Sequence, residues 1–317
     1  MKTLTVGAND AGQRLDKFLQ KAVPLLPKPL LYKYIRLKRI KVNGKKCDIA
    51  QKTAFGDKLE LYISDEFFSE ASVSFKDAPA DLKIVYEDEN ILLVDKPSGM
   101  LVHEDESESR DTLINRILRY LYDKGEYNPE NEHGFTPALC NRIDRNTGGI
   151  VIAAKNFESL QVLNQKIKDR EITKLYLCLV HGRPAQKSGI LKGFHTKDST
   201  NRIVKIQKIP VEGAKTALTK YKILAEFDDY SLLEIELLTG RTHQIRAHMA
   251  SIGHPLVGDT KYGVNRMNKG IWLKFQALYS YKLIFSFKTG AGILDYLKGR
   301  SFEVKNVPFI SGKKFLL

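Results

Sequence analysis

The sequence predicts an α+β protein: a large domain built on a mixed, mainly antiparallel sheet, preceded by a small, basic α/β domain. Strand-like segments outnumber helical ones over most of the chain, whereas two helical segments lie close together near the N-terminus. Residues 65–80 separate these regions and show no clear period. We therefore expect a small domain at 1–64, a linker at 65–80 and a large domain at 81–317, and 317 residues are enough for both cores.

Positive charge is concentrated in the small domain. The chain carries a formal net charge of +14. Residues 11–63 contain 13 Lys or Arg against 4 Asp or Glu. This asymmetry indicates a polyanionic partner, and nucleic acid is the partner we expect. The alternative is that these charges only solvate the outer faces of two helices.

The elements of the small domain follow one another in a simple order. Residues 11–23 have the apolar spacing of one helix face, three prolines interrupt the chain, and residues 30–40 repeat the helical spacing. "IKVNG" predicts a strand entering an Asn-Gly turn, and "DKLELYI" predicts a second strand. Four basic residues at the second helix are expected to contact RNA phosphates: Lys33, Arg36, Lys38 and Arg39.

In the large domain, strands dominate. "LKIVYEDENILLVD" predicts two strands around an acidic turn, and "KLYLCLVHG" and "YSLLEIELLTG" predict two more. "GIVIAAK" is apolar on both faces, which is typical of a central strand. Helices are predicted for residues 112–122, after a capping Asn156, and in "RTHQIRAHMASIGHP", which Gly253 and Pro255 end.

Asp144 is the first candidate for chemistry. It stands a few residues before the apolar "GIVIAAK" strand, where a carboxylate is costly to desolvate unless a cation pairs with it. Arg246, on the short helix of "RTHQIRAHM", could reach it as a bidentate partner and keep it ionised. The start of that helix, with Arg241 and His243, offers backbone N–H groups that favour an anion. The plain alternative is that Asp144 and Arg145 are turn residues.

Other patterns limit the class of protein. Three scattered cysteines fit a reducing compartment, no apolar run of membrane length occurs, and the polar start does not resemble a secretory signal, so a cytoplasmic protein is expected. His243 and His248 are five positions apart rather than four, which disfavours a helical metal site. No phosphate-loop or dinucleotide fingerprint is present. We expect neither a metal nor a cofactor.

Four ordered motifs resemble one known family. "ILLVDKPSGMLVH", "NRIDRNTGGIVIAAK", "TKLYLCLVHG" and "LTGRTHQIRAHMASIGHPLVGDTKYG" are similar, in this order, to the motifs of the RluA-type RNA pseudouridine synthases. "RLDKFL", "YKYIRLKRIKVNGK" and "GDKLEL" resemble the small RNA-binding domain of the ribosomal protein S-four type. Together they cover nearly the whole chain. The resemblance implies the pseudouridine synthase fold and the isomerisation of uridine to pseudouridine.

The resemblance also implies roles for individual residues. Asp144 matches the catalytic aspartate, Tyr176 the active-site tyrosine, and Arg246 the arginine that pairs with the aspartate. Arg142 matches an arginine that fills the space left by the flipped-out nucleotide, and Arg241 and His243 are expected to contact RNA.

Three positions depart from the family pattern. Asn141 stands where histidine is usual, Gly148 where serine is usual, and Tyr279 where histidine is frequent. None of them removes a proposed catalytic group, although they put RNA choice and the details of base flipping in question.

The branch that the sequence resembles most modifies large-subunit ribosomal RNA, so the expected partner is 23S ribosomal RNA or its precursor, bound by a monomer. Three alternatives stay open: a synthase acting on transfer RNA, a non-catalytic RNA-binding or ribosome-assembly factor, and a hydrolase with Asp144 as general acid. The hydrolase lacks a convincing second carboxylate.

Overall fold

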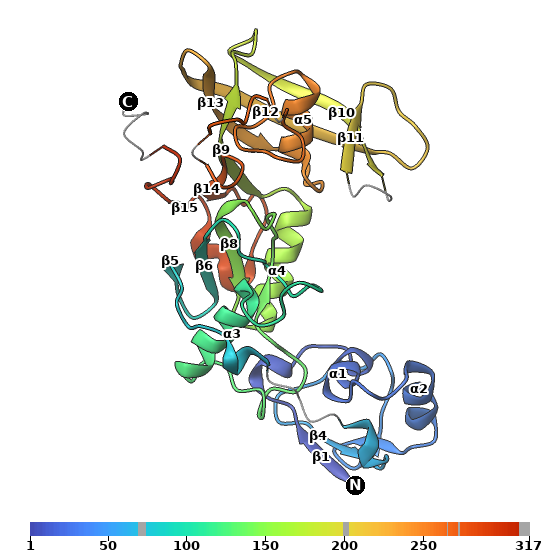
Figure 1. Cartoon of the computed structure of the whole chain (residues 1–317). Helices are drawn as coiled ribbons and strands as arrows, with labels where there is room; N and C mark the ends of the chain where they lie inside the picture. Colours follow the sequence, from blue (N-terminus) through green and yellow to red (C-terminus); the bar gives the residue numbers. More distant parts are fainter. Residues whose placement is uncertain (69–73, 199–202, 265, 272, 311–317) are drawn as a thin grey trace.

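The protein folds into two sheet-based parts that follow each other along the chain (Figure 1). The computed structural model describes residues 1–68, 74–198, 203–264, 266–271 and 273–310. In Figure 1 the N-terminal part lies at one end of an elongated molecule and the larger sheet fills the rest. This arrangement is the α+β architecture that the sequence predicts.

The N-terminal part is a four-stranded antiparallel sheet covered by two helices. Its strands lie in the order β1-β4-β2-β3. Leu15, Phe18, Leu31 and Ile35 of the helices pack on the sheet and are buried, as their spacing predicts. The elements are α1 (Leu15–Ala22), α2 (Lys28–Arg36), β1 (Lys2–Thr5), β2 (Ile40–Val42), β3 (Lys45–Lys46) and β4 (Lys58–Leu61). The helical charges stay outside: Lys33, Arg36, Lys38 and Arg39 are all exposed.

The larger part is one long, mixed sheet. Its main path is β11-β10-β12-β13-β9-β14-β8-β6-β5, with β15 beside β14 and β7 beside β8. Neighbouring strands in it run antiparallel, except that β14 pairs with β8 in parallel. Its strands are β5 (Ile84–Glu87), β6 (Ile91–Lys96), β7 (Ala138–Leu139), β8 (Gly148–Ala154), β9 (Ile172–His181), β10 (Ser188–Asp198), β11 (Ile203–Gln207), β12 (Lys215–Glu226), β13 (Tyr230–Leu237), β14 (Leu278–Phe285) and β15 (Ser301–Glu303).

Strand β8 is central, as its apolar sequence predicts. Every residue of it is buried, and β6 and β14 lie on its two sides. One face packs on α3 (Leu113–Asp123) and the other on α4 (Phe157–Lys168), whose N-terminal caps are Thr112 and Asn156. Helix α5 (Gln244–Ser251) contacts β10, β11 and β12 farther along the sheet.

The two parts share a buried contact. The carboxylate of Asp10 accepts hydrogen bonds from the backbone N–H groups of His133 and Gly134, at 3.0 and 2.7 Å. Lys21 donates to the carbonyl of Gly134 at 2.8 Å. The ring of Phe18 lies where a side chain on Gly134 would begin, because a Cβ there would be 2.3 Å from Phe18 Cδ2. The N-terminal part is therefore docked onto the 131–134 segment.

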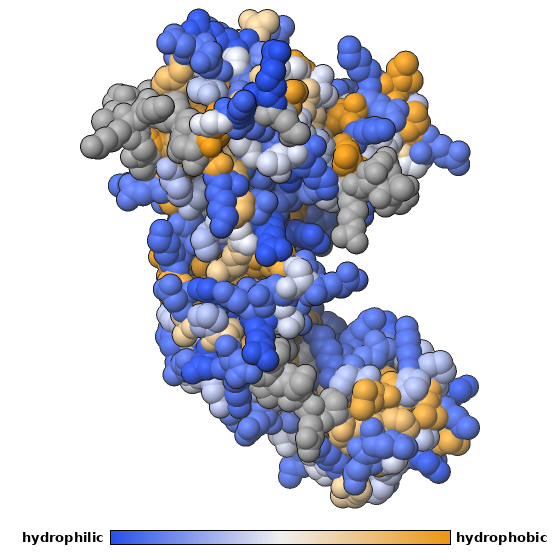
Figure 2. All heavy atoms as spheres, in the orientation of Figure 1, coloured by the Kyte–Doolittle hydropathy of each residue, from blue (hydrophilic) through white to orange (hydrophobic). Residues whose placement is uncertain are grey.

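The surface is mostly polar. Figure 2 shows hydrophilic side chains over most of the visible face, with apolar residues gathered in small areas. None of the helices in the described ranges is both long and apolar enough to cross a bilayer.

Candidate active site

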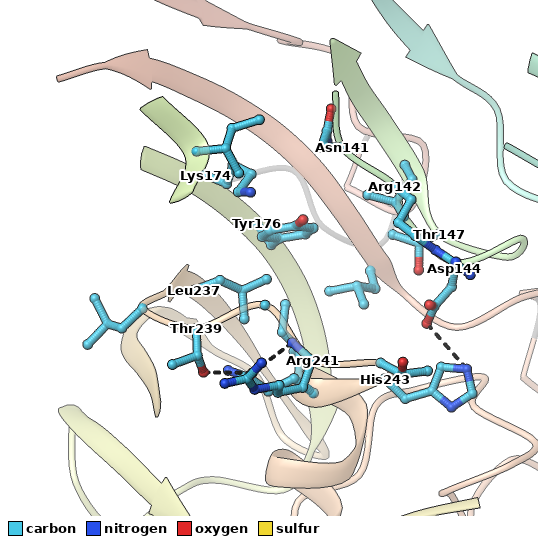
Figure 3. A pocket seen from close by; sticks show the side chains of 18 of the residues that line it. Asn141, Arg142, Asp144, Thr147, Lys174, Tyr176, Leu237, Thr239, Arg241 and His243 are labelled. Carbon is cyan, nitrogen blue, oxygen red and sulfur yellow. Dashed lines mark hydrogen bonds and ion pairs between the residues drawn. The ribbon is translucent and has the colours of Figure 1, made fainter. Parts of the chain in front are cut away.

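The residues singled out in the large domain meet in one cavity of about 460 Å³ (Figure 3). Its lining comes from the 140–147 loop before β8, the end of α4 with the following Arg170, the start of β9, the 237–246 segment that enters α5, and Leu278 of β14. Asp144, Arg142 and Tyr176 line it, together with Arg241, His243 and Arg246. The sheet order explains the meeting, because β8, β14, β9 and β13 are successive neighbours. Lys33, Arg36, Lys38 and Arg39 are not part of its lining and lie on the N-terminal domain.

Asp144 and Asp259 share one guanidinium. Arg246 donates to Asp144 Oδ2 from one terminal nitrogen at 3.2 Å. Its Nε and other terminal nitrogen donate to the two carboxylate oxygens of Asp259, at 2.7 and 3.0 Å. The bidentate partner is therefore Asp259, which differs from the sequence-based expectation of a bidentate Arg246–Asp144 pair. Asp144 keeps part of its carboxylate free toward the cavity, with 27% of its side chain exposed.

Asp259 is fixed from its other side. Its Oδ1 also accepts the backbone N–H groups of Lys261 and Tyr262, at 2.9 and 3.0 Å. Although burial opposes ionisation, the hydrogen bonds and charge of Arg246 bring the net pKa of Asp259 below its usual value. Arg246 in turn packs over the ring of Tyr262, 5.1 Å from its centroid. This buried set holds the guanidinium still, so that it can present one N–H to Asp144.

His243 approaches the same carboxylate oxygen of Asp144 as Arg246 does. Its Nε2 is 3.9 Å from Asp144 Oδ2, and its Nδ1 is hydrogen-bonded to the Tyr262 hydroxyl at 2.8 Å. The backbone of His243 has φ of +52°, a left-handed value that non-glycine residues seldom adopt. Burial lowers the pKa of His243, although the charge of Asp144 acts in the opposite direction. The lowered pKa favours the neutral ring.

Tyr176 supplies the aromatic wall. It sits on β9 between β13 and β14, and its ring faces the cavity (Figure 3). Burial raises the pKa of its hydroxyl to about 12, with a smaller contribution from the charge of Asp144. The phenol is therefore protonated at neutral pH and can donate a hydrogen bond.

Lys96 ties two of the motif loops together. It is completely buried at the end of β6, and its ammonium donates to the carbonyls of Pro97, Met100 and Arg145, at 3.0, 2.8 and 3.0 Å. Burial lowers its pKa to about 7, while the charges of Asp144 and Asp95 act in the opposite direction. This contact fixes the backbone immediately after Asp144.

Two of the three departures from the family pattern are one linked change. A Cβ on Gly148 would be 2.4 Å from Cε2 of the Tyr279 ring, so residue 148 has no room for a side chain beside this tyrosine. The Tyr279 hydroxyl donates to the buried carboxylate of Asp95. The third departure, Asn141, accepts the backbone N–H of Ile152 at 2.8 Å and lines the cavity. It thus holds the loop to β8.

Sequence reasoning missed Asp259, Lys96 and Tyr262. Asp259 lies within the motif "GHPLVGDTKYG". The signal that could have identified it is that a buried arginine such as Arg246 needs a carboxylate that accepts two hydrogen bonds. Lys96 follows an apolar strand, a position where a lysine needs several acceptors.

Comparison with known proteins agrees with this geometry. Residues 90–251 match the RNA pseudouridylate synthase family, and residues 13–57 match the S4 domain. The chain is 36% identical over 289 residues to an uncharacterized RNA pseudouridine synthase of Mycoplasma genitalium, covering 86% of this chain and 85% of that protein. It is 33% identical over 261 residues to the ribosomal large subunit pseudouridine synthase D of Escherichia coli, covering 82% of this chain and 76% of that one.

A solved structure gives the same result for the fold. The human RNA pseudouridylate synthase domain containing 1 superposes with a TM-score of 0.53 at 25% identity, over 70% of this chain and 83% of that one. Fold, site and matched motifs together define an RNA-modifying enzyme that isomerises uridine. The chain belongs to the RluA family of RNA pseudouridine synthases and carries an S4 domain at its N-terminal end.

Proposed function

We propose that this enzyme converts specific uridines of large-subunit ribosomal RNA to pseudouridine, with Asp144 as its catalytic carboxylate. The observation that carries the proposal is the Asp144–Arg246–Asp259 arrangement. In it, one guanidinium donates hydrogen bonds both to the buried carboxylate of Asp259 and to the carboxylate of Asp144, which faces the cavity. Support for the RNA class comes from relatives named as ribosomal large subunit synthases, at 31–36% identity.

The reaction is an isomerisation and needs no external reactant. The bond between the ribose and the uracil nitrogen breaks, and a bond from the ribose to a ring carbon forms. That carbon loses its proton, and the freed nitrogen gains one, so atoms and charge balance. Asp144 acts on the sugar or on the uracil ring, and in both routes the Arg246 N–H holds its carboxylate in place.

Tyr176 and Arg142 take the roles of holding the base. The uracil enters beside the Tyr176 ring, and the protonated phenol can donate to the base while it rotates. Arg142 is exposed at the mouth of the cavity and can occupy the place that the extruded nucleotide leaves in the RNA. Extrusion costs a few kcal/mol of lost stacking, which such an insertion offsets in part.

RNA is first gathered by the N-terminal domain. Its exposed Lys33, Arg36, Lys38 and Arg39 offer contacts to phosphates without reading sequence. Arg241 and His243 then contact the RNA where it passes the cavity.

Pseudouridine mapping tests the proposal. Unmodified transcripts of large-subunit ribosomal RNA, small-subunit ribosomal RNA and transfer RNA are incubated with the protein, and pseudouridine is located by chemical modification and reverse transcription. We expect new pseudouridines in the large-subunit transcript alone. Conversion only in transfer RNA would overturn the substrate, and no conversion in any transcript would overturn the proposal as a whole.

A further inference from the structure

The lining of the cavity is more cationic than the proposed chemistry needs. Six of its residues are Lys or Arg, against the single acidic residue Asp144. The six are Arg142, Lys168, Arg170, Lys174, Arg241 and Arg246. Asp144 and Asp259 neutralise Arg246, while Arg142 and Arg241 have proposed contacts with the RNA. Three cations around the start of β9 are left without a function.

Lys174 faces the same cavity as the active-site tyrosine. Side chains two apart on a strand point to the same face, and Ile172, Lys174 and Tyr176 of β9 all line the cavity. Figure 3 shows Lys174 and Tyr176 side by side on this strand. Burial lowers the pKa of Lys174. An ammonium in this setting gains from an anion that arrives with the ligand.

Arg170 lies in the turn that leads from α4 into β9. Its backbone has φ of +59°, in the left-handed region that arginine seldom occupies. The next residue, Glu171, is buried and pairs with the buried Lys166 at 2.7 Å. Lys166 also donates to the hydroxyl and carbonyl oxygens of Thr289, at 2.6 and 2.8 Å. Glu171 thus pairs with Lys166, and the exposed side chain of Arg170 lines the cavity, where a ligand can reach it.

We propose that Arg170 and Lys174 bind a backbone phosphate of the RNA beside the target uridine, on the strand that carries Tyr176. This inference rests on the proposed function and adds a contact for the flipped nucleotide. A phosphate is the anion that RNA brings to the cavity. The planar guanidinium of an arginine can donate two hydrogen bonds to the phosphate oxygens, and the ammonium of a lysine can add one positive charge beside them. Lys174 and Tyr176 are two positions apart, so one nucleotide can stack on the ring while its phosphate meets the ammonium. The pair thus fixes the backbone on the opposite side of the cavity from Asp144.

The first experiment measures RNA affinity against salt. The Arg170→Gln/Lys174→Gln variant is compared with Lys298→Gln/Lys305→Gln, which removes the same charge from two exposed lysines away from the cavity. All proteins carry Asp144→Asn to prevent turnover, and the RNA is the unmodified large-subunit transcript. We expect the cavity variant to bind about tenfold more weakly, with a salt slope smaller by roughly one unit, and the control to be nearly unchanged. Equal affinities and slopes in the two variants would overturn the proposal.

The second experiment locates the phosphate. Single-turnover conversion is measured on a short RNA that contains the uridine modified by the wild-type protein, with one flanking phosphate at a time replaced by an uncharged methylphosphonate. One replacement should slow the wild-type enzyme about tenfold and have little effect on the cavity variant. A double variant that keeps both charges, Arg170→Lys/Lys174→Arg, should recover most of the rate. Additive effects on the rate for every replacement would contradict a shared contact.

The two proposals fail in different ways. If the wild-type protein converts no uridine in any transcript, the proposed function is wrong, and the affinity measurement still decides whether Arg170 and Lys174 bind RNA. If the wild-type protein converts uridine and the cavity variant matches its rate and affinity, only the phosphate contact is wrong. Melting temperatures of all variants show whether a weaker activity comes from unfolding.

Discussion

Arg246 gives two of its hydrogen bonds to Asp259 and only one to Asp144. The completely buried Asp259 thus fixes the arginine, and the remaining N–H serves the carboxylate that faces the cavity. Arg246 donates to one oxygen of Asp144, and the side chain of Asp144 stays partly exposed in the lining of the cavity. An arginine that is fixed by a second carboxylate can thus orient Asp144 without covering it.

Removing Asp259 should therefore damage both stability and catalysis. Asp259→Ala leaves the Arg246 charge buried without its main partner, and we expect the free energy of unfolding to fall by on the order of 3 kcal/mol. Asp259→Asn is the matched variant, because it can still accept the backbone N–H groups of Lys261 and Tyr262. Denaturant unfolding and single-turnover conversion are the measurements. Wild-type values for Asp259→Ala in both would show that Asp259 does not support Arg246.

Asp144→Asn should abolish conversion and spare RNA binding. The shape of the side chain is nearly kept while its charge is removed, so the rate should fall by more than about a thousandfold. Affinity for the unmodified transcript should stay within a few-fold of the wild-type value. Product formation in a single turnover measures the conversion rate, and a filter-binding titration measures the affinity for RNA. Near-normal turnover would remove Asp144 from the mechanism.

Gly148 and Tyr279 should behave as a coupled pair. Gly148→Ser alone forces a side chain against the buried Tyr279 ring and should cost about 1–3 kcal/mol of stability. Tyr279→His alone removes the hydrogen bond to Asp95. The double variant restores the residues usual in the family and should be more stable than the sum of the single changes predicts, by about 1 kcal/mol. Strictly additive changes in unfolding free energy would mean that the two positions are independent.

The Lys166–Glu171 pair should make stability depend on acid pH. The hydrogen bond from Lys166 holds the pKa of Glu171 at about 2, below its ordinary value of 4.5. A depressed carboxyl pKa stabilises the fold above about pH 4.5, and that contribution disappears as the pH falls toward 2. The melting-temperature difference between wild type and Glu171→Gln should be large at pH 6 and much smaller at pH 3. Glu158→Gln, an exposed acid on α4, is the control and should show no such narrowing.

The N-terminal domain should supply a salt-sensitive part of RNA binding. Changing Lys33, Arg36, Lys38 and Arg39 to Gln should reduce the salt dependence by roughly one unit for each phosphate that the variant no longer binds. The single-turnover rate at saturating RNA should be unaffected, because none of the four lines the cavity. Affinity measured at several salt concentrations gives the slope. An unchanged slope would place the main RNA-binding surface elsewhere.

Local patterns predicted much of the fold because they report burial directly. The apolar run of β8 indicates a strand covered on both faces, and Asn156 caps α4 as its position suggests. The strands between residues 188 and 226 were harder to predict from their pattern. Strand β12, for example, buries Ala217, Thr219 and Tyr221, which include small and polar side chains, so its apolar alternation is weak.

The site was predictable only as far as its motifs reach. The resemblance leads to Asp144, Tyr176 and Arg246, and the structure places all three at one cavity. Asp259 lies within one of these motifs, yet the motif alone did not identify it as the partner of Arg246, because it reaches Arg246 through a turn after α5 and no periodic pattern links the two residues. The same holds for Gly148 and Tyr279, whose mutual fit depends on the parallel pairing of β8 with β14.

The contact between Phe18 and Gly134 affects how the N-terminal domain folds while the chain is being synthesised. Phe18 belongs to the core of the N-terminal domain, and part of the cover over its ring is the backbone of a segment that is synthesised much later. Asp10 also receives its two backbone partners from that later segment. A nascent N-terminal domain therefore leaves the ribosome with a ring and a carboxylate that do not yet have these partners. Its assembly is completed only after the 131–134 segment emerges, which couples the folding of the RNA-binding domain to the progress of translation.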